Sequence, residues 1–540
     1  MLSSIRTATS SAELPMLRRL PRAARLGGFM PSCAAVSGVH FAPTVHHVPS
    51  RSTSTSTNAA NGAPFNRGLH TTSEVRNIVA DRGRAVAQET EDIFLMDRLL
   101  EVVSQKVDRA HVRDIPMRNP ALWSESGLFE HEGREHAPKE PEDGPIKTLY
   151  EPHIPRRMTD SYCEIDLPFS KEPKLVDRYT NASGGIRTGK LMEHLDSIAG
   201  SIAYKHMLGP SATSVGPIEQ AGFYLVTASV DRLDMLGRLD PTRDLRLSGM
   251  VIYTGKSSME VSVKMASVGG GKGGKDETVL IGRFSMVCLS AETNRATRVN
   301  PLVRATPEEE QLHAMGEAIK NRRSTIASQS LDRVPPTKAE ADALHQLYLK
   351  HGDPEYEPRM VFSSSQHSAP PSSDEHDCVW MSDSRLEKTQ LMFPQVRNLH
   401  NKVFGGYLMR LAYELGFASA SLFCRGPIRF FSLDGISFAK PVPIGSILRL
   451  KSWVLHSATT AEHPVLVHVG VTANVVDVRT GKEETTNEFR FTWSREDGAP
   501  LNRTVVPRTY GEAMLWLEGG RALQTGLEIR ESRERKSATA

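Results

Sequence analysis

Two stretches of the chain share one succession of polar and apolar positions: a polar turn that contains glycine leads directly into a long apolar segment. The first stretch is 181–200 and the second is 398–417. Each apolar segment predicts a long helix, and because apolar residues surround most of it, the helix must be enclosed by other elements. At a constant offset of 217 residues, the matching pairs are Asn181 and Asn398, Gly189 and Gly406, Leu191 and Leu408, and Met192 and Met409.

Segments with a period of two follow each predicted helix. In the first copy, residues 259–265 alternate between apolar and polar, a turn at 253–257 precedes them, and residues 281–286 are expected to pair back. In the second copy, the alternation is clearest at Val465, Val467, Val469, Val471, Phe489, Phe491 and Trp493. This pattern predicts antiparallel sheets with one covered face.

The repeat extends to both sides of the helices. Similar opening strands precede them at 160–169 and 383–393, and Val230–Leu233 matches Leu433–Ile436 at an offset of 203 residues. A repeat of this length indicates a duplicated domain and not a solenoid, whose units are shorter. The predicted class is α+β, with one strand, one long helix and four or five antiparallel strands present twice. A curved sheet would enclose each helix, and the two units would cover each other's edge strands.

The composition along the chain predicts six regions. They are a disordered presequence at 1–70, a helical and irregular N-terminal arm at 71–155, a first folded domain at 156–302, a helical and Ser/Pro-rich linker at 303–378, a second folded domain at 379–495 and a C-terminal tail at 496–540. The helical period predicts a helix over 89–107 in the arm and two helices in the linker, beginning at Pro307 and Ala339. The tail is predicted to hold one short helix, Gly511–Leu517.

The first 70 residues have the composition of a mitochondrial presequence. They contain seven arginines, no lysine and a single acidic residue, Glu13, among many serines, threonines and alanines. A disordered basic tail is the alternative interpretation. The expected location is the mitochondrion, in the matrix.

The presequence also accounts for the basic charge of the chain. The whole sequence has a formal net charge of +3, and the seven arginines and one glutamate of residues 1–70 contribute more than that. The charge therefore gives no reason to expect nucleic acid as a partner.

No apolar run is long enough to predict a transmembrane span. The five cysteines are scattered, without the spacing of a metal site, so no metal is expected.

A glycine-rich run, Gly269–Lys275, begins like a phosphate-binding loop. However, Asp276 occupies the position where such a loop has Ser or Thr, and the run links two predicted strands instead of opening a helix. It is predicted to be a hairpin loop.

Several motifs together resemble the double hotdog acyl-CoA thioesterases of the mitochondrial type. They are Arg187-x-Gly189-x-Leu191-Met192-Glu193-x-Leu195-Asp196-Ser197, Ser258-Met259-Glu260-Val261, Val299-Asn300-Pro301-Leu302, Val379-Trp380-Met381, Asn398-x-x-Asn401-x-x-Phe404-Gly405-Gly406-Tyr407-Leu408-Met409-Arg410, Lys440-Pro441-Val442 and Thr509-Tyr510-Gly511-Glu512. They spread over about residues 156–516, roughly two-thirds of the chain. The resemblance implies two tandem hotdog domains that form an intramolecular pseudo-dimer. It also implies hydrolysis of acyl-CoA without a metal or redox cofactor, and a homo-oligomer, by family analogy a trimer of the double unit.

Thioester hydrolysis needs a positioned water and a place for the developing oxyanion. The first amides of a helix are unpaired and lie at its positive end, so Gly189 and Gly406 are candidate oxyanion donors. Close packing of the helices is the alternative role of these glycines. The resemblance points to a carboxylate or asparagine as the group that orients the water. Asn181, Asn398 and Asn401 precede the helices and are candidates, with turn formation as their alternative role.

Two carboxylates, Asp196 and Glu414, lie inside the apolar helices, where an unpaired charge would be costly, so both are candidate residues of a polar site. Arg410 stands four residues before Glu414 and could pair with it, whereas Asp196 has no basic residue at helical spacing and is the candidate general base. Many hotdog thioesterases carry an aspartate where this chain has Lys402 and Gly185, so one of the two pseudo-symmetric sites could be inactive. Candidate partners for the CoA phosphates are Arg187, Lys190 and Lys402.

Two alternative functions remain open from the sequence. A hotdog enoyl-CoA hydratase would need an Asp/His pair in a turn that leads into the helix, but Asn300-Pro301 is followed by Leu302-Val303 and comes after the strands. The other alternative is a non-catalytic acyl-CoA-binding or scaffold protein. Serine-hydrolase chemistry is not expected, because the sequence has no Gly-x-Ser-x-Gly motif.

Overall fold

The computed structural model describes residues 92–117, 154–215, 221–271, 274–351, 377–398 and 402–539. The predicted presequence, most of the irregular arm and the Ser/Pro-rich part of the linker lie outside these ranges. Among the described residues, no helix combines the length and apolar character that crossing a membrane requires.

The first half of the fold is built around helix α3 (Thr188–Leu208), which the predicted turn at 181–187 introduces. Strand β2 (Cys163–Leu167) and the short helix α2 (Pro173–Tyr179) precede it. Five antiparallel strands follow: β3 (Phe223–Val230), β4 (Leu233–Met235), β5 (Leu245–Thr254), β6 (Ser258–Ser267) and β7 (Glu277–Ser290). The glycine-rich run lies between β6 and β7, which pair with each other, so the hairpin prediction is confirmed.

The second half repeats this order around helix α7 (Gly405–Cys424). Strand β10 (Leu386–Leu391) precedes the helix. The strands after it are β11 (Arg429–Leu433), β12 (Ile436–Phe438), β13 (Ile447–Ala458), β14 (Val465–Val476) and β15 (Glu483–Arg495). Two small two-stranded sheets lie outside these halves: β1 (Arg156–Arg157) with β8 (Leu302–Val303), and β9 (Asp377–Trp380) with β16 (Arg503–Val506).

The strands of both halves form one 12-stranded sheet. Its main path runs β10-β13-β14-β15-β11-β4-β7-β6-β5-β2, while β12 pairs with β15 and β3, and β3 pairs with β12 and β7. At the seam, Leu233 of β4 pairs with Leu433 of β11, and Val230 of β3 pairs with Ile436 of β12. Because the 203-residue offset relates Val230 to Leu433 and Leu233 to Ile436, the two halves meet reciprocally.

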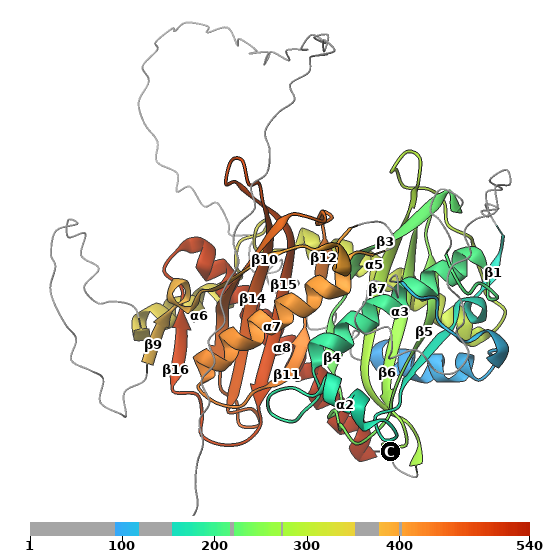
Figure 1. Cartoon of the computed structure of the whole chain (residues 1–540). Helices are drawn as coiled ribbons and strands as arrows, with labels where there is room; N and C mark the ends of the chain where they lie inside the picture. The colour runs from blue at the N-terminus through green and yellow to red at the C-terminus, as the bar shows by residue number, and fades with distance from the viewer. Residues whose placement is uncertain are drawn as a thin grey trace, which may run out of the picture. The chain divides into compact units, whose positions relative to one another are not determined.

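Helices α3 and α7 lie over the same face of this sheet (Figure 1). Almost every side chain of α3 is buried, as the apolar pattern required. One hydrophobic core runs through both halves and includes Leu195 of α3, Leu411 of α7 and Trp493 of β15. The two helices contact each other near their first turns, since a Cβ atom at Gly406 would lie 2.9 Å from the Glu193 backbone.

Other helices cover parts of the opposite face. The helix at 92–104 and α5 (Pro307–Ser328) share a second core with β5, in which Met96, Ile252 and Leu312 are buried. The helix predicted at 89–107 is present over 92–104 of the described residues, and the helices predicted from Pro307 and Ala339 are α5 and α6 (Lys338–His351).

The prediction for the C-terminal tail was wrong in length. In place of a short helix at Gly511–Leu517, α8 runs from Tyr510 to Thr539 and packs on β13 and β14. Gly519 and Gly520 resemble a helix stop in sequence, but in the structure they bring α8 close to the sheet. A Cβ atom at Gly519 would lie 2.7 Å from the Cβ atom of His456.

Candidate active site

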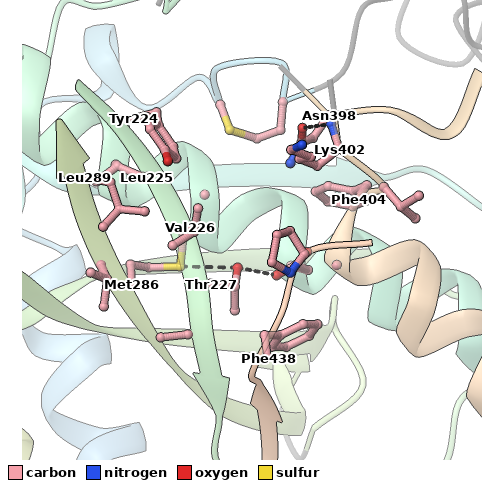
Figure 2. A pocket seen from close by; sticks show the side chains of 18 of the residues that line it. Tyr224, Leu225, Val226, Thr227, Met286, Leu289, Asn398, Lys402, Phe404 and Phe438 are labelled. Atoms are coloured by element: carbon pink, nitrogen blue, oxygen red, sulfur yellow. Dashed lines mark hydrogen bonds between the residues drawn. The ribbon is translucent and has the colours of Figure 1, made fainter. Parts of the chain in front are cut away.

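A cavity of about 570 Å³ lies where the first turn of α7 meets α3 and β3 (Figure 2). Its walls come from α3, β3, β7, the segment that leads into α7, the segment after β12 and Met117 of the N-terminal arm. Most lining side chains are apolar. The polar and charged ones are Asp196, Tyr204, Tyr224, Thr227, Asn294, Asn398, Lys402 and Lys440. The two halves of the chain therefore build this cavity together.

Asp196, the candidate general base, lines the cavity with a side chain that is almost fully buried. Its Oδ2 accepts a hydrogen bond of 2.6 Å from the backbone N–H of Gly406, which belongs to the other half of the chain. Its Oδ1 accepts a hydrogen bond of 2.8 Å from the Thr227 hydroxyl. These donors offset the cost of burying the carboxylate, and they hold it beside the positive end of α7.

The two glycines at the start of α7 have different neighbours. Gly405 lines the cavity, and a Cβ atom there would lie 3.0 Å from Asp196 Oδ2 and 3.2 Å from Phe438 Cε1. Gly406 instead faces α3, where a Cβ atom would lie 2.9 Å from the Glu193 carbonyl oxygen. Gly406 thus has the packing role considered from the sequence, and its amide binds the Asp196 carboxylate, while its role as an oxyanion donor stays a prediction.

Thr227 is a site residue that the sequence did not single out. It lies in β3, where its hydroxyl donates to Asp196 Oδ1, and Figure 2 shows Met286 on its other side. A threonine within a strand is ordinary, so no local signal marks it. Only the contact with Asp196, 31 residues earlier in the chain, gives it a role.

Asn398 lies at the mouth of the cavity, beside Lys402 (Figure 2). Its Oδ1 accepts a hydrogen bond of 3.1 Å from the Lys402 backbone N–H. This bond fixes the orientation of the carboxamide at the wall of the cavity. Asn401 lies outside the described residues.

Asn181, the counterpart of Asn398, does not line this cavity. Its Oδ1 accepts hydrogen bonds from the backbone N–H groups of Ser183 and Gly185. The bond to Gly185 spans four residues, like the bond from Lys402 to Asn398. Asn181 therefore forms the equivalent turn, as its alternative role proposed. Gly189 likewise faces the other helix, where a Cβ atom would lie 3.2 Å from Arg410 and Tyr413.

The charged candidates near the helix starts form ion pairs between the two halves. The expected pairing of Arg410 with Glu414 is replaced by a pair between Arg410 and Glu193 of α3, at 3.0 Å. Glu414 pairs with Arg187 at 2.9 Å. The local helical spacing did not decide the partners, because α3 and α7 pack against each other near their first turns and bring other charges closer.

The three cations predicted for CoA phosphates separate in space. Lys402 is exposed and lines the cavity mouth, as does Lys440, which had been noted only as part of a motif. Arg187 is engaged by Glu414, away from the cavity lining. Lys190 is buried, with its ammonium 4.9 Å from the centre of the Tyr179 ring. Of the three, only Lys402 is placed to meet a ligand in this cavity.

The equivalent place in the other half is filled with aromatic rings. The offset of 217 residues that relates the two helices matches Asp196 to Tyr413. The offset of 203 residues that relates the strands after the helices matches Thr227 to Phe430. The two rings pack edge to face with their centres 5.5 Å apart, and Tyr413 also contacts Phe491 and Trp493. Loss of hydration raises the pKa of the Tyr413 phenol to about 12, so it stays protonated at neutral pH.

The described cysteines and histidines offer little for other chemistry. Burial raises the pKa of Cys163, Cys288 and Cys424 to about 12, so their thiols stay protonated. In the part of the chain that the structure describes, no group of three or more His, Cys, Asp or Glu side chains is arranged to hold a metal ion.

Comparison with known proteins places this geometry in context. No family model matches the chain. Mitochondrial acyl-coenzyme A thioesterase 9 of Homo sapiens is 37% identical over 373 residues, covering 68% of this chain and 78% of the relative. Chloroplastic acyl-coenzyme A thioesterase 2 of Humulus lupulus is 30% identical over 385 residues, covering 70% of this chain and 83% of the relative. Among solved structures, an acyl-CoA hydrolase from Staphylococcus aureus in complex with butyryl coenzyme A and coenzyme A is 25% identical. It covers 30% of this chain and 95% of its own, with a TM-score of 0.26.

Proposed function

Because the chain belongs to the acyl-coenzyme A thioesterase family, we propose that it hydrolyses acyl-CoA to a free carboxylic acid and CoA. The observation that carries this proposal is the buried Asp196 carboxylate, bonded to the first turn of α7 at the wall of a largely apolar cavity. Such a cavity can hold an acyl chain, and the carboxylate can act on a water at its thioester. The names of the mitochondrial relatives support a mitochondrial location, and we place the enzyme in the matrix.

The proposed architecture is two tandem hotdog domains, at about 156–302 and 379–495, that form an intramolecular pseudo-dimer. The reciprocal pairing at the seam supports it, because Val230 with Ile436 and Leu233 with Leu433 are equivalent contacts. The pair between Glu193 and Arg410 supports it too, since these residues occupy the same position in α3 and α7. The assembly is proposed to be a homo-oligomer of this double unit, a trimer by family analogy.

In the proposed reaction, Asp196 accepts a proton from a water while the water oxygen attacks the thioester carbonyl carbon. The tetrahedral intermediate then collapses, the carbon–sulfur bond breaks, and CoA leaves as a thiolate. A thiol with a pKa of about 8.5 is a good leaving group, so departure does not require prior protonation. The proton held by Asp196 passes to the thiolate or to solvent. No metal or redox cofactor is part of this proposal, because a thioester carbonyl is already electrophilic.

The first turn of α7 supplies the positive potential for the oxyanion. The Gly406 N–H binds the Asp196 carboxylate, whereas the N–H groups of Tyr407 and Leu408 donate to the Phe404 carbonyl oxygen. As the carboxylate takes up a proton and becomes neutral, negative charge moves to the substrate oxygen, which is proposed to lie beside the N–H groups of Gly405 and Gly406. One such donor typically contributes ~3 kcal/mol of transition-state stabilisation. Thr227 positions the carboxylate, and Asn398 donates from the mouth of the cavity.

Only one of the two pseudo-equivalent places is proposed to be active. At the position in the second half that is equivalent to the active cavity, Tyr413 replaces Asp196 and Phe430 replaces Thr227. Neither of these aromatic side chains is a base near neutral pH. The CoA phosphates are proposed to meet Lys402 and Lys440 at the mouth of the active cavity, where both side chains are exposed.

The hydratase alternative lacks its key pair at this cavity. That reaction would need histidine together with aspartate, and the described lining contains Asp196 but no histidine. The binding-protein alternative is favoured if Asp196, Asn398 and Asn401 are all hydrogen-bonded away from any cleft, whereas Asp196 and Asn398 line one.

The test is release of free thiol from a graded panel of acyl-CoAs by the full chain. Asp196→Asn keeps the shape of the side chain but removes its basicity. It should lower kcat by roughly a hundredfold or more, which is the rate enhancement that a general base typically contributes. Asn398→Ala should lower kcat/KM by about tenfold or more, equivalent to roughly 1.4 kcal/mol.

Asn181→Ala is the matched control, because it removes the same amide from the equivalent turn outside the cavity. Its kcat/KM should stay within about threefold of the wild type, or roughly 0.65 kcal/mol. Full activity of Asp196→Asn would contradict the assignment of the base. Absence of hydrolysis by the wild type on every acyl-CoA would contradict the function itself.

A further inference from the structure

The two ends of the cavity differ in chemical character. At one end, Lys402 and Lys440 are exposed and mark the side from which a phosphate-bearing molecule can enter. Beyond Asp196, the lining includes the apolar stretch formed by Met117, Gly200 and Leu225, which ends at the polar side chains of Tyr204, Tyr224 and Asn294. If CoA occupies the cationic mouth, the acyl chain must extend past Asp196 into this apolar stretch.

Met117 lies on the face of α3 that an acyl chain would follow. Gly200 is four residues after Asp196 on α3, so both face the cavity one helical turn apart. A Cβ atom at Gly200 would lie 3.0 Å from Met117 Sδ and 3.2 Å from its Cγ. The missing side chain of Gly200 therefore makes room for Met117, whose own side chain is only 6% exposed.

The segment that carries Met117 is fixed to α3 at several points. The backbone N–H of Ile115 donates a 2.6 Å hydrogen bond to Ser201 Oγ. One turn further along the helix, Lys205 donates to the carbonyl oxygen of His111. Ile115 is buried in the core, and a bridge between Arg113 and Glu164 of β2 adds a further link. Met117 is thus held in place by contacts that do not involve the cavity.

The spacing along α3 gives the reach of the acyl chain. With a rise of 1.5 Å per residue, Gly200 lies ~6 Å beyond Asp196 and Tyr204 lies ~12 Å beyond it. An extended chain advances by about 1.2 Å per bond, so ~5 bonds reach the level of Met117 and ~10 reach Tyr204.

We propose that Met117, seated on Gly200, limits the length of the acyl chain, so that the preferred substrates carry short acyl chains. This proposal rests on the proposed function, since it concerns the substrate of the same site. Tyr204 forms the next wall, because its hydroxyl is bound by the Leu225 backbone N–H at 3.1 Å. Removing the Met117 side chain should therefore open the path only as far as Tyr204.

The test compares kcat/KM for butanoyl-CoA, hexanoyl-CoA and decanoyl-CoA in the full chain. Met117→Ala should raise the kcat/KM for decanoyl-CoA, relative to the kcat/KM for butanoyl-CoA, by roughly tenfold or more. The reason is that each newly buried methylene favours the longer chain by about fourfold. Met117→Phe places a larger side chain at the same position and should lower the kcat/KM for hexanoyl-CoA relative to that for butanoyl-CoA. The two variants change the length preference in opposite directions, so a fold defect in one does not remove the test.

Ile115→Ala is the matched control, since it loosens the same segment without touching the cavity lining. It should leave both ratios within about twofold of the wild type, well below the change expected for the methylenes of a longer chain. Unchanged ratios in both Met117 variants, with an active wild type, would overturn the inference and leave the proposed function intact. An equal shift in Ile115→Ala would also overturn it, because the limit would then belong to the whole segment. No hydrolysis of any chain length by the wild type would instead refute the proposed function.

Discussion

At the scale of single residues, the two glycines that open α7 face different neighbours, one in the proposed active cavity and one in α3. Gly405 faces Asp196 and Phe438 across the cavity, while Gly406 faces the backbone of α3 at Glu193. Both positions demand a small residue, but for different reasons. One leaves space for substrate beside the carboxylate, and the other lets two helices approach closely enough for the Gly406 amide to reach Asp196.

Alanine substitutions should reveal this difference. Gly405→Ala places a methyl group between Asp196 and Phe438, so kcat/KM should fall by roughly ten- to a hundredfold, as for a misplaced reactant, while the thermal midpoint changes little. Gly406→Ala forces a methyl group against backbone atoms, so the free energy of unfolding should fall by ~1–3 kcal/mol, typical of overpacking. Thermal unfolding and thiol release measure the two effects, and the same loss of stability in both variants would refute the distinction.

At the scale of elements, α8 depends on the sheet that it covers. Two glycines inside a helix cost ~1 kcal/mol each relative to alanine, yet Gly519 and Gly520 let α8 lie directly on His456. His456 Nδ1 lies 2.8 Å from the Trp516 carbonyl oxygen, and the two rings are in contact. Burial lowers the pKa of His456 to about 4 and that of its neighbour His468 well below its usual value.

These shifts predict a loss of stability in acid. The unfolded chain binds a proton at His456 below pH 6.5, whereas the folded chain does not until about pH 4. The free energy of unfolding should therefore fall as the pH drops through this interval. His456→Gln removes the titrating group and should make the thermal midpoint less dependent on pH. The exposed His345 serves as control, and an equal change in His345→Gln would contradict this origin.

At the scale of the whole molecule, one buried cation joins the two halves of the sheet. Arg232 donates to Asp234 in its own half and, across the seam, to Asp434 and to Ser432 of β11. Its side chain is only 9% exposed, so these charges interact in a medium that screens them weakly. Together with the pairing of β4 with β11, this cluster makes the halves parts of a single sheet.

Arg232→Met should therefore weaken the protein as a unit. It keeps the volume of the side chain but deprives two acidic neighbours of this cation, and breaking a buried pair typically costs ~3–5 kcal/mol. Chemical unfolding monitored by tryptophan fluorescence and by circular dichroism should show both halves unfolding at a lower denaturant concentration. Arg238→Met is the control, since Arg238 forms an exposed pair with Glu496. Similar losses in the two variants would argue against a special role for the seam.

The sequence alone determined the elements that depend on local order. The two polar turns, the long apolar helices and the period-two strands were all predicted, because each follows from residues a few positions apart. Asp196 was also singled out locally, as a charge without a basic neighbour in an apolar helix. The family resemblance likewise depended only on motifs that are continuous in the chain.

Tertiary structure decided everything that depends on contacts between distant segments. Gly406 reaches Asp196 across 210 residues, Thr227 gains its role only from that carboxylate, and Glu414 finds Arg187 instead of Arg410. The extension of α8 past two glycines depends on the sheet beneath it. The physical reason is common to all of them: periodicity reports which face of an element is apolar, but not which other element covers that face.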